Sequence, residues 1–358
     1  MQKDNIFSKR YTNIIKGIAV LILCWHHLFW HNVAVPVDVK TADIMDILIP
    51  ITKVCVALFT MLSGYGIYES FQRGNTTYGK FTFLHVKKLL VNYWWIYIPV
   101  FVLSFFFHVE GTPIQIYGMG VRGIRNFLLD FFGLRAMIYS KTLNNTWWYM
   151  EAALVFYLCF PCFYKALNKF PAVLLGISAL PVLLVSVNIF WEGFITTDRE
   201  LFYMFPFLAG MELSRRGILN KLAACCKQDK KSRREFLTYS IVILLIFGVM
   251  RTQISLIADT FYAASIIAVG IGIASFENGV VKVLDFLGRH SMNIFLIHSM
   301  VYYYFAGSKM LLEHIHGAVI KYAVLIFICL GCSVLVENIK GYVHKIWNQH
   351  KILKGIKK

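Results

Sequence analysis

The side chains best suited to chemistry are ionisable groups that lie within long apolar stretches. They are Lys16, His26, His27, Glu151, Asp259 and His298. Burying an ionisable group in a membrane is costly, so such residues are functional candidates by default. A histidine beside a carboxylate can move protons near neutral pH, because one group acts as a base while the other orients it or stabilises its protonated form. This set predicts either acyl transfer to a hydroxyl or a proton relay.

Helical periodicity puts Lys16 and His27 on one face of the first apolar stretch. The two residues are eleven positions apart, which at about 100° per residue returns to within roughly 20° of the same direction. On the same geometry His26 points about 80° away from Lys16, so His27 is the stronger candidate. A buried histidine that only packs between helices is the competing interpretation.

Depth in the bilayer favours a shared site for three of these residues. At a rise of about 1.5 Å per residue, His27 lies roughly 16 Å from the cytoplasmic edge of an apolar core about 30 Å thick. The same arithmetic puts His298 at about 14 Å and Glu151 at about 21 Å. All three would fall within about 7 Å of depth near the midplane. Asp259 is expected near the outer end of its helix, where exposure to the interface explains it.

The composition is that of an integral membrane protein. Of the 358 residues, 58% are hydrophobic and only 15% are charged, and the mean hydropathy is +0.61. Soluble domains carry about 25% charged residues, so a water-soluble enzyme is excluded. The eight cysteines lie mostly in apolar stretches without the neighbouring His or carboxylate of a metal site, and we predict neither a disulfide framework nor a metal.

Ten apolar stretches are long enough to span a bilayer. They are 12–31, 44–68, 82–108, 145–165, 170–190, 199–214, 236–252, 254–276, 289–307 and 316–337. We therefore predict an all-α polytopic fold with about ten transmembrane helices. Both termini are expected in the cytoplasm, because this leaves most Lys and Arg residues on the inner side. Residues 1–340 would form the transmembrane domain and 341–358 a basic cytoplasmic tail.

Two connections stand out between the predicted spans. Residues 109–144 are apolar enough to lie in the membrane interface, and we expect a lid or an interfacial helix there. Residues 215–235 hold the largest block of basic charge, typical of a tether to anionic headgroups and less often of a dock for a phosphorylated cofactor.

Three lysines are candidates for binding the phosphates of a cofactor. Lys16 lies at the cytoplasmic mouth of the first span, and Lys87 and Lys88 lie at the cytoplasmic end of the third. Ammonium groups bind phosphates as point charges. Anchoring of the helices at the inner surface explains such lysines equally well. Trp148 is expected in an interfacial aromatic belt, and it could also stack on a sugar ring.

Several motifs, taken in order, resemble acyltransferase family 3, which includes bacterial O-acetyltransferases of surface polysaccharides. The first is Lys16 and His27, a basic residue and a histidine separated by ten residues. The others are Ser63-Gly64, the pattern from Trp147 to Pro161 that contains Glu151, the block from Phe205 to Glu212, and the block from Leu287 to His298. The similarity runs through most of the chain.

The resemblance implies ten spanning helices, an acyl-CoA donor that enters from the cytoplasm and a carbohydrate acceptor approached from the outer side. It implies His27 as the catalytic residue. We further predict that Glu151 is a second catalytic residue, which orients His27 or binds the acceptor, and that His298, Trp148 and Ser63 are substrate contacts. The family often has two arginines three positions apart near the third helix, where this chain has Lys87 and Lys88. Lys16 also replaces the more frequent arginine, so the bidentate phosphate contact of arginine is absent at both places.

We therefore predict a multi-pass O-acyltransferase of the bacterial plasma membrane with His27 as general base. The donor would be an acyl-CoA, with acetyl-CoA the first choice, and the acceptor a polysaccharide or lipid-linked sugar. Membrane lipids are the other expected partners, and nucleic acid is not expected. Direct transfer and a transient acyl-histidine are both open. The alternatives are a transporter or flippase with a His/Glu proton relay, which predicts inverted repeats that the sequence does not show, and a membrane scaffold or sensor.

Overall fold

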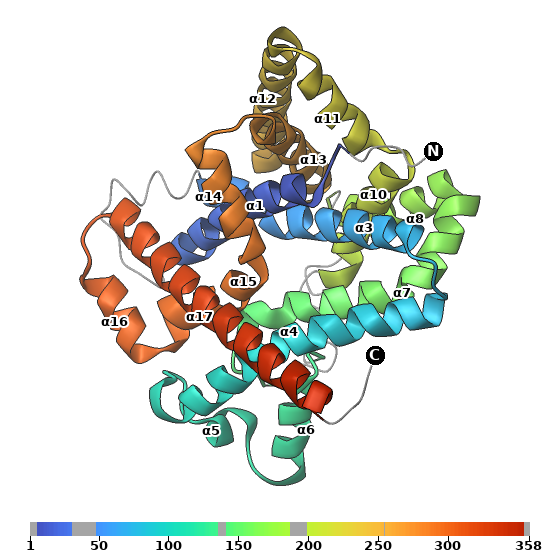
Figure 1. Ribbon diagram of the computed structural model, residues 1–358. Helices are drawn as coiled ribbons and strands as arrows, with labels where there is room; N and C mark the ends of the chain where they lie inside the picture. The colour runs from blue at the N-terminus through green and yellow to red at the C-terminus, as the bar shows by residue number, and fades with distance from the viewer. Residues whose placement is uncertain (1–5, 31–47, 135–140, 187–198, 254, 354–358) are drawn as a thin grey trace.

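The structure, a computed structural model, describes residues 6–30, 48–134, 141–186, 199–253 and 255–353, and is built from helices (Figure 1). The α-helices are α1 (Lys9–Phe29), α3 (Cys55–Arg73), α4 (Tyr78–Phe107), α5 (Pro113–Tyr117), α6 (Gly120–Phe131), α7 (Trp148–Lys169), α8 (Pro171–Ser186), α10 (Arg199–Arg215), α11 (Ile218–Gln228), α12 (Lys230–Gln253), α13 (Ser255–Ala274), α14 (Gly279–Arg289), α15 (Ser291–Ser299), α16 (Ala306–His314) and α17 (Ala318–Leu353). Two short helices, the 3-10 helix η3 (Asn145–Trp147) and the π-helix η4 (Met300–Tyr304), join them. Within these ranges the only strand-like pairing is an isolated bridge between His108 and Phe305.

Six helical segments of the described chain are long and apolar enough to cross a membrane. They are Lys9–Phe29, Leu48–Arg73, Tyr78–Phe107, Asn145–Lys169, Lys230–Thr252 and Ala318–Gln349, and two shorter apolar helices cover Pro171–Val185 and Ala258–Ala274. The predicted all-α multi-pass fold is confirmed, whereas the count of ten spans and the side on which the termini lie stay predictions.

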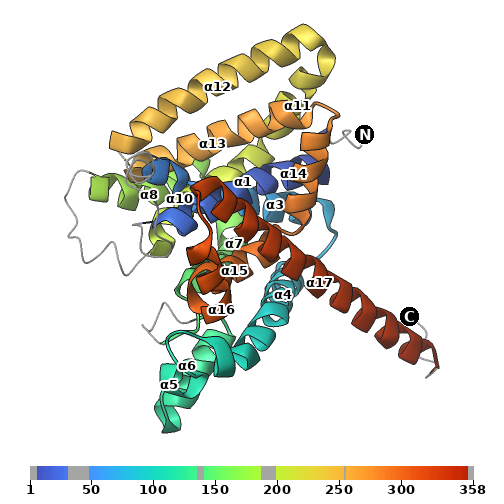
Figure 2. The ribbon, with the colours of Figure 1, turned by 90° about the vertical axis from the view of Figure 1, so that its left-hand side faces the viewer.

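The predicted span 289–307 differs most from the structure. The chain turns at His290, forms α15 over nine residues and continues as the five-residue π-helix η4. Together these two helices are only about 20 Å long, short of a core about 30 Å thick. Hydropathy measures the length of an apolar stretch and does not register a break within it. At the other end of the chain, α17 continues through residue 340, the boundary predicted for the tail, and extends away from the body (Figure 2).

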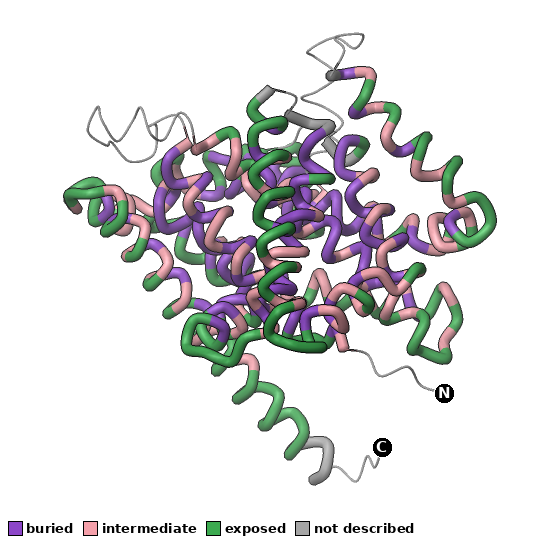
Figure 3. The backbone as a smooth tube through the Cα atoms, turned by 90° about the horizontal axis from the view of Figure 1, so that it is seen from above, coloured by how far each residue is buried: buried purple, intermediate pink, exposed green. Residues whose placement is uncertain are grey.

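Large apolar side chains on the outside of the helices fit a lipid environment. Phe106 on α4 is 75% exposed, Leu245 on α12 is 64% exposed and Phe327 on α17 is 78% exposed. Figure 3 shows that buried residues gather in the interior, with exposed ones on the peripheral helices. Exposed apolar surface of this extent is not stable against water, so the outer faces of these helices are suited to lipid.

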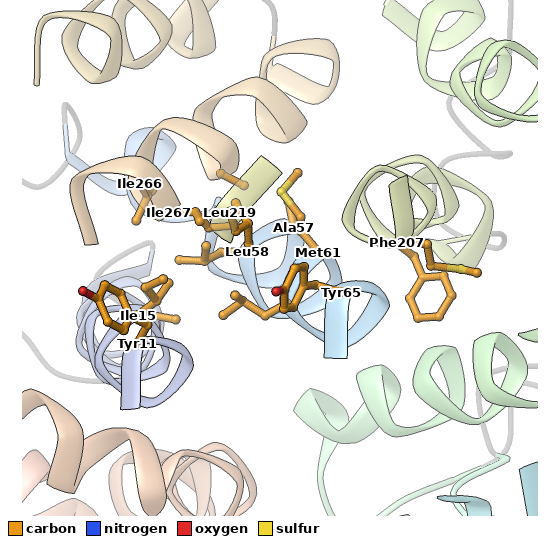
Figure 4. Packing of buried hydrophobic residues seen from close by; sticks show 14 of the residues in the cluster. Tyr11, Ile15, Ala57, Leu58, Met61, Tyr65, Phe207, Leu219, Ile266 and Ile267 are labelled. Carbon is orange, nitrogen blue, oxygen red and sulfur yellow. The ribbon is translucent and has the colours of Figure 1, made fainter. Parts of the chain in front are cut away.

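Reciprocal glycine contacts allow α3 and α10 to approach closely. A Cβ atom on Gly64 would overlap the carbonyl oxygen of Phe207, and a Cβ on Gly210 would overlap that of Met61. Figure 4 shows Met61 and Tyr65 of α3 in the same buried cluster as Phe207 of α10. Small residues that bring helix backbones together are a common means of packing in membranes, where the hydrophobic effect does not drive helix association.

The same arrangement joins α1 to α14. A Cβ on Gly17 would overlap the carbonyl oxygen of Leu284, and a Cβ on Gly288 would overlap that of Asn13. The Asn13 side chain also donates a hydrogen bond to Asp285 at 2.9 Å. Since α14 leads directly into α15, this crossing determines where α15 lies beside α1.

A lobe built from α5 and α6 lies beyond the end of α4 (Figures 1 and 2). The capping box of Thr112 and Gln115 starts α5. The apolar side chains Val121, Ile124 and Leu128 follow helical spacing along α6 and are 86%, 62% and 45% exposed. An amphipathic helix of 12 residues thus occupies the connection in which an interfacial helix was predicted. Its position in the membrane interface stays a prediction.

Candidate active site

Two histidine rings from distant parts of the chain lie against each other. The ring centroid of His27, at the end of α1, is 5.1 Å from that of His298, at the end of α15, and the ring planes are inclined by 55°. His298 is completely buried, whereas His27 is partly exposed. The sequence places the two residues at similar depth, and the structure brings them together. His27 is therefore the more accessible ring of the pair, with His298 buried beside it.

One hydrogen bond fixes the protonation of His298. Its Nδ1 lies 2.7 Å from the carbonyl oxygen of Phe295. Since a carbonyl oxygen only accepts, Nδ1 carries the proton, and the neutral ring has its lone pair on Nε2. Nε2 is buried without a hydrogen-bond partner among the described residues. An unpaired buried acceptor is costly, so this nitrogen is suited to receive an N–H of His27 or a hydroxyl of a bound molecule.

His26, next to the candidate base, has a structural role. Its Nδ1 lies 3.2 Å from the carbonyl oxygen of Ile49 and 3.2 Å from Oγ1 of Thr52. The residue is buried. These contacts tie the end of α1 to the segment that precedes α3. This agrees with the helical periodicity, which separates His26 from the face shared by Lys16 and His27.

The segment before α7 holds α15 in place. The indole Nε1 of Trp147 donates to the carbonyl oxygen of Leu296 at 2.9 Å. The Asn144 amide donates to Oγ of Ser299 at 2.7 Å. After Ser299 the chain enters the π-helix η4, and π-helical turns are frequent at functional sites. His298 therefore lies between two anchored neighbours, which fixes the position of its ring.

Glu151, predicted as the second catalytic residue, lies in the first turn of α7 and is completely buried. A buried carboxylate requires polar partners, so the complete burial of Glu151 is consistent with a functional role. α7 begins directly after Trp147, which is bonded to α15. The catalytic role of Glu151 stays a prediction.

Ser63 and Trp148, predicted as substrate contacts, have different surroundings. Oγ of Ser63 is 3.5 Å from the hydroxyl of Tyr149. The Tyr149 ring packs edge-on against Phe295 at 5.8 Å between centroids, which connects Ser63 to α15. Trp148 is partly buried, and its ring lies 5.6 Å from that of Tyr203 on α10. A role of either residue in binding substrate stays a prediction.

Of the predicted donor lysines, Lys16 lies in the N-terminal half of α1, and Lys87 and Lys88 lie in the N-terminal half of α4. Lys16 is partly exposed, and the positive charges of Lys88 on α4 and of Lys9 act on it. Lys87 and Lys88 are both exposed. Along α1 the distance from Lys16 to His27 is about 16 Å. An elongated molecule with phosphates at one end and a thioester at the other could therefore reach both places.

Asp259 is buried, so the interfacial exposure expected for it is wrong. Its Oδ1 lies 2.6 Å from Nε of Arg251, and the two side chains are 6% and 2% exposed. The two groups are poorly oriented for a hydrogen bond, because neither of these buried atoms has a hydrogen-bond partner among the described residues. Arg251 is not among the sequence-predicted candidates, because a basic residue at the end of an apolar stretch ordinarily marks the interface. The sequence pattern that could have indicated this pair is a base, Arg251, near the end of α12 and an acid, Asp259, near the start of α13.

In the described ranges no group of three or more His, Cys, Asp or Glu side chains could hold a metal ion.

Comparison with known protein families gives one match. The family model described as an acyltransferase domain, that of acyltransferase family 3, covers residues 9–338. No match is found among curated proteins or among solved structures. The covered range runs from the first residue of α1 into α17 and contains His27, Glu151 and His298. Because the match spans nearly the whole chain, the protein belongs to acyltransferase family 3.

Proposed function

We propose that the protein is a plasma-membrane O-acyltransferase of a bacterium that moves an acyl group from acyl-CoA to a hydroxyl of a carbohydrate. The donor is acetyl-CoA, and the acceptor is a polysaccharide or a lipid-linked sugar. His27 is the general base. The observation that carries the proposal is the pair formed by the partly exposed ring of His27 and the buried ring of His298, whose lone pair lies on Nε2.

The arrangement supports the following reaction. His27 takes the proton of the acceptor hydroxyl while the hydroxyl oxygen attacks the thioester carbonyl carbon. The carbon–sulfur bond then breaks, and the CoA thiolate receives the proton from His27. An ester and a free thiol result, so atoms and charge balance. If the acyl group passes first to His27, the same substrates are consumed and the same products form.

His298 acts through His27 in this proposal and is a positioning residue. Its Nδ1–H is held by Phe295, so the buried Nε2 is left as the acceptor. A hydrogen bond from an N–H of His27 to this nitrogen leaves the other nitrogen of His27 to act as the base. The buried Glu151 is proposed to assist by stabilising the protonated form of His27.

The lysines support the direction from which the donor enters. The phosphates of the donor bind where Lys16 and Lys88 lie close together, with Lys87 beside them, and the thioester reaches His27 about 16 Å further along α1. This end of the helices, with both termini, faces the cytoplasm in the proposal. The lobe of α5 and α6 then faces the outer side, from which the carbohydrate arrives.

The test is transfer of radiolabelled acetyl from acetyl-CoA by the full-length protein in lipid nanodiscs, with release of CoA thiol measured in parallel and a panel of oligosaccharides as acceptors. We expect His27→Ala to lower both rates by about 10²- to 10⁴-fold, the usual contribution of a general base. His298→Ala should lower both rates less than His27→Ala.

His314→Ala provides a matched control. His314 lies at the end of α16, and its Nδ1 lies 2.7 Å from a backbone carbonyl oxygen, as in His298, but its ring is exposed. This variant should keep the wild-type rates. Absence of labelled product and of CoA release from the wild type, or wild-type rates for His27→Ala, would contradict the proposed function.

A further inference from the structure

A polar pocket of about 330 Å³ opens in the lobe beyond α4. It is lined by Glu110, Gln115, Ile116, Lys141, Thr142 and Asn145. These residues come from the turn after α4, from α5, and from the segment that leads into η3 together with its first residue. The volume is at the lower end of the range of small-molecule sites, which is about 300–1,000 Å³. One sugar ring with its hydroxyl groups fits a pocket of this size.

The lining combines hydrogen-bond donors and acceptors around a single apolar side chain. Glu110 supplies a carboxylate that accepts, Lys141 an ammonium group that donates, and Thr142 a hydroxyl. Gln115 uses Oε1 to accept from the backbone N–H and the hydroxyl of Thr112, so its amide nitrogen is the group that can donate into the pocket. A molecule with many hydroxyl groups matches such a lining, whereas an acyl chain does not.

A buried carboxylate holds one wall of the pocket in place. Asp130 is 1% exposed and accepts hydrogen bonds from the hydroxyl of Thr142 at 2.7 Å, the backbone N–H of Leu143 at 3.0 Å and the hydroxyl of Tyr117 at 2.6 Å. The Thr142 oxygen also accepts from the backbone N–H of Asn144 at 3.1 Å, which leaves one lone pair able to accept from a ligand. The wall is therefore preorganised, which lowers the entropy lost on binding.

The same wall is bonded to the candidate active site. Asn144 donates to Ser299 at 2.7 Å, and the hydroxyl of Thr146 lies 2.9 Å from the same oxygen. The backbone N–H of Asn145 donates to the hydroxyl of Tyr304 at 3.0 Å. Ser299 directly follows His298. Residues 142–146 thus line the pocket at one end and hold the neighbour of the positioning histidine at the other.

We propose that this pocket is a subsite for one sugar ring of the carbohydrate acceptor, held by Glu110, Gln115, Lys141 and Thr142 while another part of the acceptor presents its hydroxyl to His27. This inference rests on the proposed function and adds the place and the residues of acceptor recognition. The bonds from residues 144–146 to Ser299 and Tyr304 keep the subsite at a fixed position relative to His298.

The experiment measures binding of the full-length protein in nanodiscs to an array of neutral, acidic and amino-sugar oligosaccharides. The double variant Glu110→Ala, Lys141→Ala removes two exposed side chains that make no hydrogen bond within the described part of the lobe, so the lobe keeps its fold. We expect it to bind the recognised oligosaccharides at least about ten-fold more weakly than the wild type, a loss in line with two polar contacts. Lys282→Ala, which removes an exposed lysine from α14, is the matched control and should bind as the wild type does.

Kinetics with a recognised oligosaccharide give a second readout. The double variant should raise KM for the oligosaccharide about ten-fold and leave kcat and KM for acetyl-CoA unchanged. Binding to no oligosaccharide on the array, or unchanged binding by the double variant, would overturn the subsite. Failure of the subsite can be distinguished from failure of the proposed function. His27→Ala should bind the same oligosaccharides as the wild type, so binding tests the subsite independently of CoA release.

Discussion

The glycine crossing between α1 and α14 offers a sensitive perturbation of the histidine pair. In Gly17→Ala the new Cβ would overlap the carbonyl oxygen of Leu284 and lie 2.9 Å from its carbonyl carbon. Carbon atoms pack best at about 3.5–4.0 Å, so α14 must move by about 1 Å. His290 ends α14 and begins α15, so the displacement is passed to the helix that carries His298.

The size of the effect follows from this displacement. A shift of about 1 Å in a group that positions a catalytic residue costs about 10²-fold in rate. Overpacking itself costs about 1–3 kcal/mol of stability, which lowers the unfolding temperature by a few degrees without preventing folding. We therefore expect Gly17→Ala to be folded in detergent and to release CoA from acetyl-CoA about 10²-fold more slowly than the wild type.

The assay compares CoA release with thermal unfolding of the same preparation. Gly279→Ala is the matched control, because it adds the same methyl group to the start of α14, where no atom lies within 4 Å of the new Cβ. This control should keep the wild-type rate. A folded Gly17→Ala protein with the wild-type rate would refute the argument that the glycine crossing sets the position of His298.

Three further predictions concern other parts of the chain. Arg251→Leu leaves the buried Asp259 without its ion-pair partner, so it should lower the free energy of unfolding by about 3–5 kcal/mol in denaturant titrations. The double variant Arg251→Leu, Asp259→Leu should recover most of this loss. Lys16→Ala and Lys88→Ala should each raise KM for acetyl-CoA by about ten-fold, while unchanged KM values in both would contradict their role at the phosphates. Burial and the nearby Asp130 carboxylate raise the pKa of Tyr117, so the stability contributed by its bond to Asp130 is fully present below about pH 10 and declines as the pH rises further toward the raised pKa. Tyr117→Phe should weaken the lobe by about 1–3 kcal/mol below pH 10 and remove this part of the pH dependence, as measured by hydrogen exchange of α5 and α6.

The histidine pair shows how far sequence reasoning reaches. Helical periodicity separated His27 from His26, and depth arithmetic put His298 at the level of His27. Both arguments use the regular rise and rotation of an α-helix, which hold wherever the chain is helical. They give direction and depth, but they do not say which helices are neighbours. The distance between Glu151 and His27 likewise depends on which helices are neighbours.

Other features depend on tertiary contacts that no local pattern encodes. Gly64 of the Ser63-Gly64 motif packs against Phe207 on a distant helix, a contact that the motif itself does not predict. The division of 289–307 into α15 and η4 depends on the bond from Trp147 to Leu296 and on the turn at His290. The pocket in the lobe depends on Asp130, a carboxylate in a connection whose apolar character was the only feature used to predict its structure.

The most direct test of the central claim is a double-mutant cycle between His27 and His298, read as the rate of CoA release from acetyl-CoA. If the two rings act as one unit, removing the second has little effect once the first is gone. We predict that His27→Ala, His298→Ala together will be no slower than His27→Ala alone. A double variant whose loss equals the product of the two single losses would show that the rings act independently and would contradict the account.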